Sequence, residues 1–170
     1  FPEIAEPNSL TYYLGDRLEK LFDETVSLLQ QFSYARYIPF LFLKRQLTPL
    51  EEQQQKNVRA FMKVLLVKRL ESSFYAFKLT IDRFVNSYAR FIEMFDNGKV
   101  YISKKINVFD YLDSDREDEL MHMVETEDII GIKSEDFSDS YRELLQGDFQ
   151  IIQKVKRMWA GVDDDPKLEA

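Results

Sequence analysis

The sequence contains no cysteine, a single histidine, and only five glycines and five prolines. Without cysteine, disulfides and thiolate metal sites are excluded, and we expect an intracellular, cytoplasmic protein. No stretch approaches the run of about 18 apolar residues that a membrane-spanning helix requires. The first residues, Phe1-Pro2-Glu3, also differ from the basic and then apolar start of a secretory leader.

The motifs of nucleotide and acyl-transfer chemistry are missing as well. Neither GxxxxGK(S/T), GxGxxG nor GxSxG occurs in the sequence. His122 has no partner at a spacing that would make it a catalytic base or a zinc ligand. Asp113-Ser114-Asp115 lacks the central glycine and the later glutamate of a calcium loop. We therefore predict no catalytic residue, no cofactor and no metal in this chain.

The charge is distributed very unevenly. The chain has 170 residues, enough for one domain with a real core, and a net charge of -7. Residues 1–53 carry a net charge of -3, residues 54–105 carry +7 and residues 106–170 carry -11. Solvated helix faces that attract one another would explain this asymmetry. The alternative is that the basic segment faces nucleic acid.

Hydrophobic spacing predicts a mainly α-helical fold. Residues 1–15 are an expected extended lead-in, because Pro2 and Pro7 disfavour helix before them. Apolar residues then recur at steps of three and four from Leu18 to Phe32, which predicts a helix with Asp16 as its N-cap. The aromatic stretch 34–47, around Pro39, is expected to be a kinked or broken helix.

The clearest pattern predicts one very long helix over about residues 48–97, with the rest of the bundle around it. Thr48 is a suitable N-cap, Pro49 a suitable first residue and Glu51 a suitable third residue. Apolar residues then alternate steps of three and four without proline or glycine: Val67, Leu70, Phe74, Phe77, Ile81, Phe84, Tyr88, Phe91 and Phe95. We expect a stiff element on the order of 70 Å long. A two-stranded coiled coil is the alternative, although phenylalanine fits its narrow layers poorly.

Shorter elements are predicted after Gly98. Residues 100–102 have the composition of a strand, so the fold has room for a small β-hairpin, and residues 10–14 are one candidate partner. The sequence predicts an acidic amphipathic helix over residues 113–125 and a loop or short strand over 128–132. Two more helices are expected, at about 134–146 and 148–160, with these residues facing inward: Leu144, Phe149, Ile152, Val155 and Trp159.

One polar cluster, Lys68-Arg69 followed by Glu71-Ser72-Ser73, interrupts the apolar helix. Charges in a buried stripe must be paired or must reach a partner. In one interpretation, Arg69 pairs with a carboxylate of its own chain. In the other, a set of basic residues contacts a phosphate backbone: Lys68, Arg69, Lys78, Arg83, Arg90, Lys104 and Lys105.

The segment Val64–Phe77, VLLVKRLESSFYAF, resembles the LLKRLESS…AF block of bacterial Snf-type superfamily 2 helicases. In those proteins the block lies in the helical region between two RecA-like ATPase lobes. Phe1-Pro2-Glu3-Ile4 looks like the KFPEI that follows their first lobe. Asp165-Pro166-Lys167-Leu168-Glu169-Ala170 looks like the DPKLEAL helix that leads into the second lobe. The three landmarks occur in the same order and span nearly the whole chain.

The resemblance implies that residues 1–170 are one helical domain, a fragment of a larger nucleic-acid-stimulated ATPase, with residues 163–170 starting the next domain. ATP and Mg²⁺ would then belong to the parent protein, and this chain alone would not be an enzyme. Its partners would be the RecA-like lobes of the parent and DNA, or RNA. Only the block Lys68, Arg69, Leu70, Glu71, Ser72 and Ser73 carries over, without an assigned chemistry. A helical protein-interaction module with no nucleic-acid role is the alternative, and a free-standing coiled-coil scaffold is a third.

Overall fold

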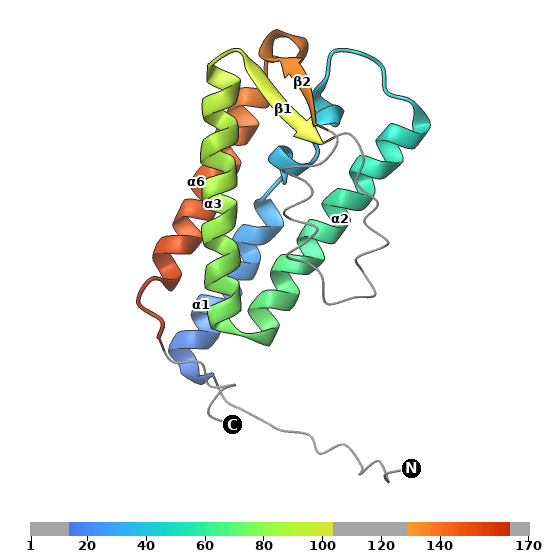
Figure 1. Cartoon of the computed structure of the whole chain (residues 1–170). Coiled ribbons are helices and arrows are strands. Elements are labelled where there is room, and N and C mark those ends of the chain that lie inside the picture. Colours follow the sequence, from blue (N-terminus) through green and yellow to red (C-terminus); the bar gives the residue numbers. More distant parts are fainter. Residues whose placement is uncertain (1–13, 104–128, 164–170) are drawn as a thin grey trace, which may run out of the picture.

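The computed structural model describes residues 14–103 and 129–163. Within them, four α-helices form a bundle with a two-stranded antiparallel sheet at one end (Figure 1). The helices are α1 (Gly15–Gln31), α2 (Pro49–Ser72), α3 (Phe74–Asp96) and α6 (Tyr141–Trp159), and the strands are β1 (Lys99–Ser103) and β2 (Ile129–Lys133). The predicted mainly α-helical fold class with a small antiparallel sheet is confirmed.

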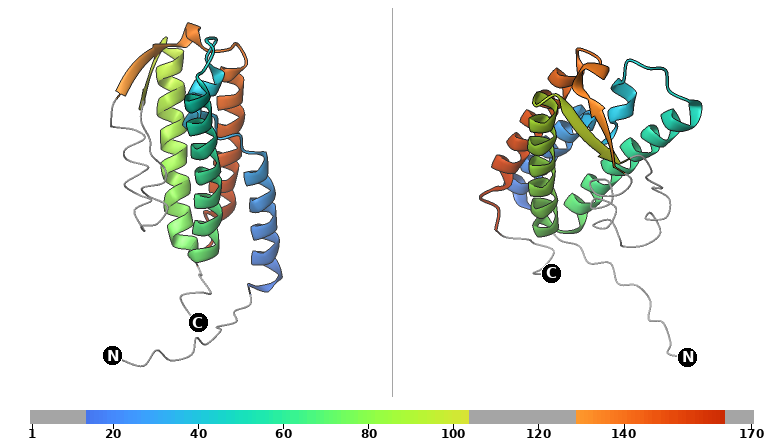
Figure 2. Two further views of the ribbon diagram at one scale, coloured as in Figure 1. Left: turned by 90° about the vertical axis from the view of Figure 1, so that its right-hand side faces the viewer. Right: turned by 45° about the horizontal axis from the view of Figure 1, so that its top comes forward.

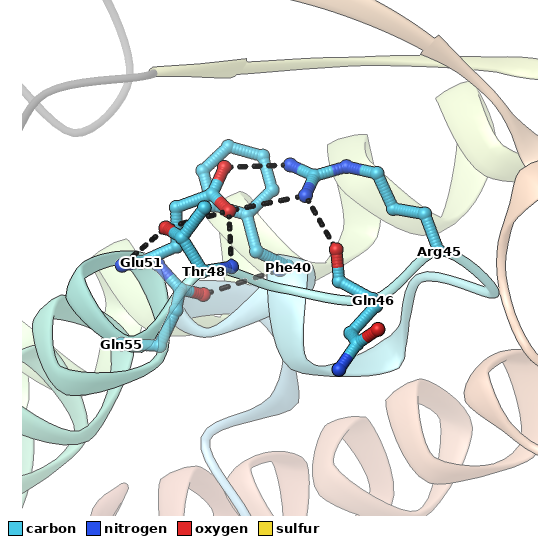
Figure 3. Close-up of polar contacts among 6 residues, drawn as sticks. All are labelled: Phe40, Arg45, Gln46, Thr48, Glu51 and Gln55. Atoms are coloured by element: carbon cyan, nitrogen blue, oxygen red, sulfur yellow. Dashed lines mark hydrogen bonds and ion pairs between the residues drawn. The ribbon is translucent and has the colours of Figure 1, made fainter.

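The start of α2 agrees with the prediction, and Figure 3 shows its contacts. The Glu51 N–H donates to Thr48 Oγ1 at 3.2 Å, and the Thr48 N–H donates to Glu51 Oε2 at 2.9 Å. This reciprocal pair is a capping box, which satisfies two backbone donors at the start of the helix. Arg45 donates to the same carboxylate at 2.7 and 3.1 Å, while Gln55 accepts from the Phe40 N–H at 3.1 Å. The segment before α2 is therefore tied to its first two turns.

The single long helix predicted over residues 48–97 is wrong, because the chain turns at Ser73. The backbone of Ser73 is extended, with φ −157° and ψ 130°. Its N–H donates to the Arg69 carbonyl at 3.0 Å and ends α2, and its Oγ accepts from the Ala76 N–H at 3.3 Å and caps α3. The two helices run in opposite directions and contact each other (Figures 1 and 2). Each is roughly 35 Å long, about half the predicted length.

The apolar seam of this segment nevertheless faces the core. From Leu70 to Phe91 every seam residue is buried, and Val67 and Phe95 at its two ends are partly buried. The centre of the bundle is α3, which packs against α6, α2 and β1. Its Phe74 and Phe77 rings lie 4.9 and 5.3 Å from the ring of the buried Trp159. Because the chain's own helices cover the seam, these residues are not available for a coiled-coil dimer.

One continuous helix, α6, replaces the two helices predicted at 134–146 and 148–160. It passes through Gly147, and a 3₁₀ turn, η3 (Ser134–Asp136), precedes it. Ile152, Val155 and Trp159 are buried as predicted, but Leu144 is 37% exposed. A single helix keeps the phase set by those three residues, and this phase turns Leu145 inward instead of Leu144.

The remaining predictions have mixed outcomes. The stretch 34–47 is broken as expected, into the 3₁₀ turns η1 (Ala35–Tyr37) and η2 (Pro39–Phe42). Asp16 is not an N-cap, because α1 begins at Gly15 after Leu14, with no side-chain cap. The strand over 100–102 is confirmed, and it pairs with β2 from Lys99 opposite Lys133 to Ser103 opposite Ile129. The lead-in before Leu14, including residues 10–13 of the strand-like segment, and the acidic helix 113–125 lie outside the described residues, as does His122.

Candidate nucleic-acid interface

The block Lys68–Ser73 forms the end of α2 and its corner with α3. Leu70 is completely buried there and anchors the corner in the core. Lys68, Glu71 and Ser72 are exposed, and Arg69 is partly buried and has an interaction partner. The polar residues of the block therefore cluster where the chain reverses, and Ser73 supplies the cap. This geometry gives the block a structural role, and it leaves Lys68 available to solvent.

Lys78 does not lie on an open basic surface. Its Nζ donates to the Val162 carbonyl at 2.8 Å and lies 3.5 Å from Asp163 Oδ1. Its side chain is 30% exposed, and α6 ends just before these two acceptors. Lys78 therefore holds the chain after α6 against α3, and this assigned role differs from the phosphate contact that the sequence predicts.

Arg83 and Arg90 share one exposed row of α3. They are seven residues apart, which is two helical turns, and both are exposed. Arg83 also has an interaction partner. The last two predicted contacts, Lys104 and Lys105, lie outside the described residues.

A second basic row, not singled out from the sequence, lies on α2. Lys56, Arg59 and Lys63 are all exposed and follow one another at steps of three and four, so they project from one side of the helix over roughly 10 Å. Lys56 Nζ lies 2.6 Å from Glu52 Oε1, in a pair in which both side chains are about half exposed. Helical spacing was the signal that could have identified this row. It consists of solvated cations at intervals that suit a phosphate backbone.

Among the charged side chains that the structure describes, Asp148 is the most enclosed, and it serves the fold. It is only 2% exposed, and its Oδ1 accepts from the N–H and hydroxyl of Ser33 at 2.7 and 2.8 Å. Its Oδ2 accepts from the Ala35 N–H at 2.8 Å and the Tyr88 hydroxyl at 2.7 Å. Burial raises the pKa of Tyr88 well above its ordinary value, with a further contribution from the Asp148 charge, so the phenol keeps the proton that it donates. All four donors come from the chain itself, and this arrangement makes Asp148 an anchor.

The ends of the described fold lie beside each other. A cavity of about 220 Å³ is lined by Arg17 and Leu18 of α1 and by Gly161, Val162 and Asp163 after α6. Figure 1 shows that α1 begins and α6 ends at the same end of the bundle, opposite the sheet. The chain thus enters and leaves the bundle at one place.

In the part of the chain that the structure describes, no three His, Cys, Asp or Glu side chains come together as a metal site would require. None of the described helices has the length and apolar character to cross a membrane. No family model matches the sequence, and neither a curated protein nor a solved structure is significantly similar to it.

Proposed function

We propose that this chain is the helical domain between the two ATPase lobes of a nucleic-acid-dependent ATPase, a helicase or translocase, and that it couples lobe movement to contact with DNA or RNA. The class of parent protein comes from the ordered resemblance of the three sequence segments. The structural observation that supports the proposal is the side-by-side position of the start of α1 and the end of α6.

Adjacent ends suit a domain that is inserted between two others. Such a domain can extend from its host without forcing the flanking parts away from each other. Lys78 strengthens this arrangement, because it ties the exit segment at Val162 to the central helix α3. A rotation of one lobe would therefore act on the bundle core through a fixed attachment.

The exposed cations of α2 are the best candidates for phosphate contact. Lys56, Arg59 and Lys63 form a row on a helix that is rigidly joined to α3 through the capped corner at Ser73. Nucleic-acid affinity that depends on such contacts decreases as salt rises, because each neutralised phosphate releases counterions.

The first prediction replaces this row by glutamine, in the triple variant Lys56→Gln, Arg59→Gln and Lys63→Gln. We expect weaker binding to a duplex of about 20 base pairs, with the slope of log affinity against log salt reduced by about 0.9 per lost contact. Fluorescence anisotropy at several salt concentrations measures both quantities, on duplex DNA and duplex RNA.

The matched control removes three exposed lysines from other parts of the surface: Lys20→Gln, Lys44→Gln and Lys154→Gln. It changes the net charge by the same amount, so it should leave the slope nearly unchanged. Equal slopes in the two triple variants would refute the α2 row as the contact. Absence of binding by the unmodified chain at low salt would refute nucleic-acid contact as a whole.

A protein-interaction role is the second candidate, and exposed apolar side chains on α2 and α3 favour it. Val64 of α2 is 47% exposed, and Tyr75 and Leu79 of α3 are 66% and 43% exposed. If the chain binds no nucleic acid, binding of the isolated ATPase lobes that is lost in Tyr75→Ser with Leu79→Ser would favour this candidate.

A further inference from the structure

The two faces of the β1–β2 sheet differ sharply. Val100 and Ile102 of β1 are buried against the bundle, and alternation along the strand places Lys99 and Tyr101 on the opposite side. On β2, Ile130 and Ile132 are partly buried, while Ile129, Gly131 and Lys133 are exposed. We call the outward set the outer sheet face: Lys99, Tyr101, Ile129, Gly131 and Lys133.

An aromatic ring lies exposed on the outer sheet face. Tyr101 is 50% exposed, and its partner directly across the sheet is Gly131. Glycine leaves no side chain there, and this matters because an added Cβ would overlap Lys99 Cε and would lie 3.4 Å from Tyr101 Cε1. The bare glycine therefore lets the Lys99 side chain cross the sheet beside the tyrosine, and Lys99 Nζ lies 5.4 Å from the centre of the Tyr101 ring.

Two lysines also face each other across the sheet. Lys99 and Lys133 are direct partners in the register, and like charges in this position destabilise a sheet. Lys133 Nζ lies 3.3 Å from Glu135 Oε1, but both side chains are about 70% exposed, so this pair offsets little of the repulsion. An anion placed between the two ammonium groups would relieve it.

We propose that the outer sheet face binds single-stranded nucleic acid, with a base stacked on Tyr101 and its phosphate between Lys99 and Lys133. This inference deepens the proposed function, on which it rests, by naming the strand state and the contact. An exposed aromatic ring beside cations is the combination by which proteins hold unpaired strands. A duplex keeps its bases stacked and presents mainly phosphates, so it would not use the ring.

The test compares Tyr101→Ala with Tyr75→Ala in the full chain. Both remove an exposed tyrosine, but Tyr75 lies on α3, far along the chain from the outer sheet face. Anisotropy with an oligothymidylate of about 12 nucleotides at low salt should show about fivefold to hundredfold weaker binding for Tyr101→Ala, and no change for Tyr75→Ala. Because the two lysines share one phosphate in this proposal, Lys99→Gln with Lys133→Gln should lower the salt slope by about 0.7.

A direct readout that needs no variant is photocrosslinking of an oligonucleotide that carries 5-iodouracil. Crosslinks in the unmodified chain should map to the peptide that contains Tyr101, and mapping only to other residues would overturn the proposal. A Tyr101→Ala variant that binds the single strand as tightly as the unmodified chain would also overturn it. So would a dimer that dissociates in Tyr101→Ala, because the face would then pair with a second copy.

The outcomes separate this inference from the proposed function. Duplex binding through the α2 row with no effect of Tyr101→Ala would remove the inference and leave the proposed function intact. Failure to bind either duplex or single strand at low salt would remove nucleic-acid contact altogether, and with it both proposals.

Discussion

At Asp148, four hydrogen bonds join α6 to the segment after α1 and to α3. The Ser33 and Ala35 contacts lie on either side of Tyr34, whose φ of 62° places a bulky residue in the left-handed region. Such a conformation costs roughly 1 to 3 kcal/mol and persists only where its surroundings fix it. The carboxylate holds both neighbours of the strained residue, and the buried Tyr34 ring packs 4.6 Å from that of Phe32.

We predict that Asp148→Asn destabilises the protein by about 3 to 5 kcal/mol. The amide puts an NH₂ group where one carboxylate oxygen accepted two hydrogen bonds, so the backbone N–H at that oxygen loses its acceptor, and the charge that strengthened all four bonds is removed. Urea unfolding followed by the fluorescence of Trp159 measures the free energy of unfolding. Asp139→Asn is the control, because the side chain of Asp139 is 99% exposed. Its ion pair, at 3.5 Å, is with the exposed Lys44, so the loss of its charge should change stability little. Equal unfolding midpoints for the two variants would contradict the anchoring role.

At the scale of the element, the capping box of α2 makes a pH-dependent contribution. The Arg45 hydrogen bonds, then those from Thr48, lower the pKa of Glu51 from 4.5 to about 2. A lowered pKa means that the folded state prefers the ionised form. The resulting stabilisation is complete above the unfolded pKa of 4.5 and is lost as pH falls toward 2.

We therefore predict that the stability difference between the unmodified chain and Glu51→Gln is constant above about pH 5 and shrinks between pH 4.5 and 2. NMR titration of the Glu51 carboxyl should give a pKa near 2, and Arg45→Met should bring it back toward 4.5 because its largest cause is removed. A Glu51 pKa that stays near 4.5 in the unmodified chain would contradict the prediction.

The start of α2 was predictable from sequence because every group in its capping box lies within a few residues. The corner at Ser73 was not predictable from periodicity, because the apolar steps of three and four continue through it into α3. Both helices bury that seam, so the hydrophobic pattern has no break where the backbone does. For α6, the two helices predicted at 134–146 and 148–160 left a break at Gly147, but packing of the flanking turns on the core outweighed the modest cost of glycine within a helix.

The basic residues also differ in how far the sequence could predict their roles. The α2 row could have been found by helical phase alone, since Lys56, Arg59 and Lys63 share one side of the helix. The role of Lys78 could not, because its acceptor, the Val162 carbonyl, is 84 residues away in the sequence. Contacts of that kind depend on how α3 and the end of α6 are placed in the bundle, and local pattern does not contain that placement.

At the scale of the whole molecule, the two ends of the bundle have different chemistry. One end holds the start of α1, the end of α6 and the corner at Ser73, and the other holds the sheet (Figure 1). In the proposed function the lobes would join the first end, and the outer sheet face would reach nucleic acid at the second. The helices between are roughly 35 Å long, so the bundle would act as a spacer of that size.

The fixed exit at Lys78 gives a prediction at this scale. Lys78→Met removes the hydrogen bond to the Val162 carbonyl, so amide hydrogen exchange in residues 160–163 should become faster. Global stability should fall by less than about 1 kcal/mol, because the Asp163 side chain of the ion pair is 89% exposed and its attraction to Lys78 is weakened by solvent. Lys156→Met is the control, since Lys156 also joins α6 to α3, through Asp82 at 2.8 Å. Equal amide exchange rates in residues 160–163 of the two variants would show that Lys78 does not hold this segment against α3.

The pairing of Ser103 with Ile129 has a consequence for how this fold tolerates change in chain length. These residues are sheet partners, so the ends of the connection between them lie about 5 Å apart. A connection of any length, from a tight turn upward, can join them without moving the bundle. Each doubling of its length would cost only about 0.6 kcal/mol of closure entropy. Insertions and deletions of many residues at this position should therefore change stability little. The same change at the Ser73 corner would displace α2 or α3 from the bundle core.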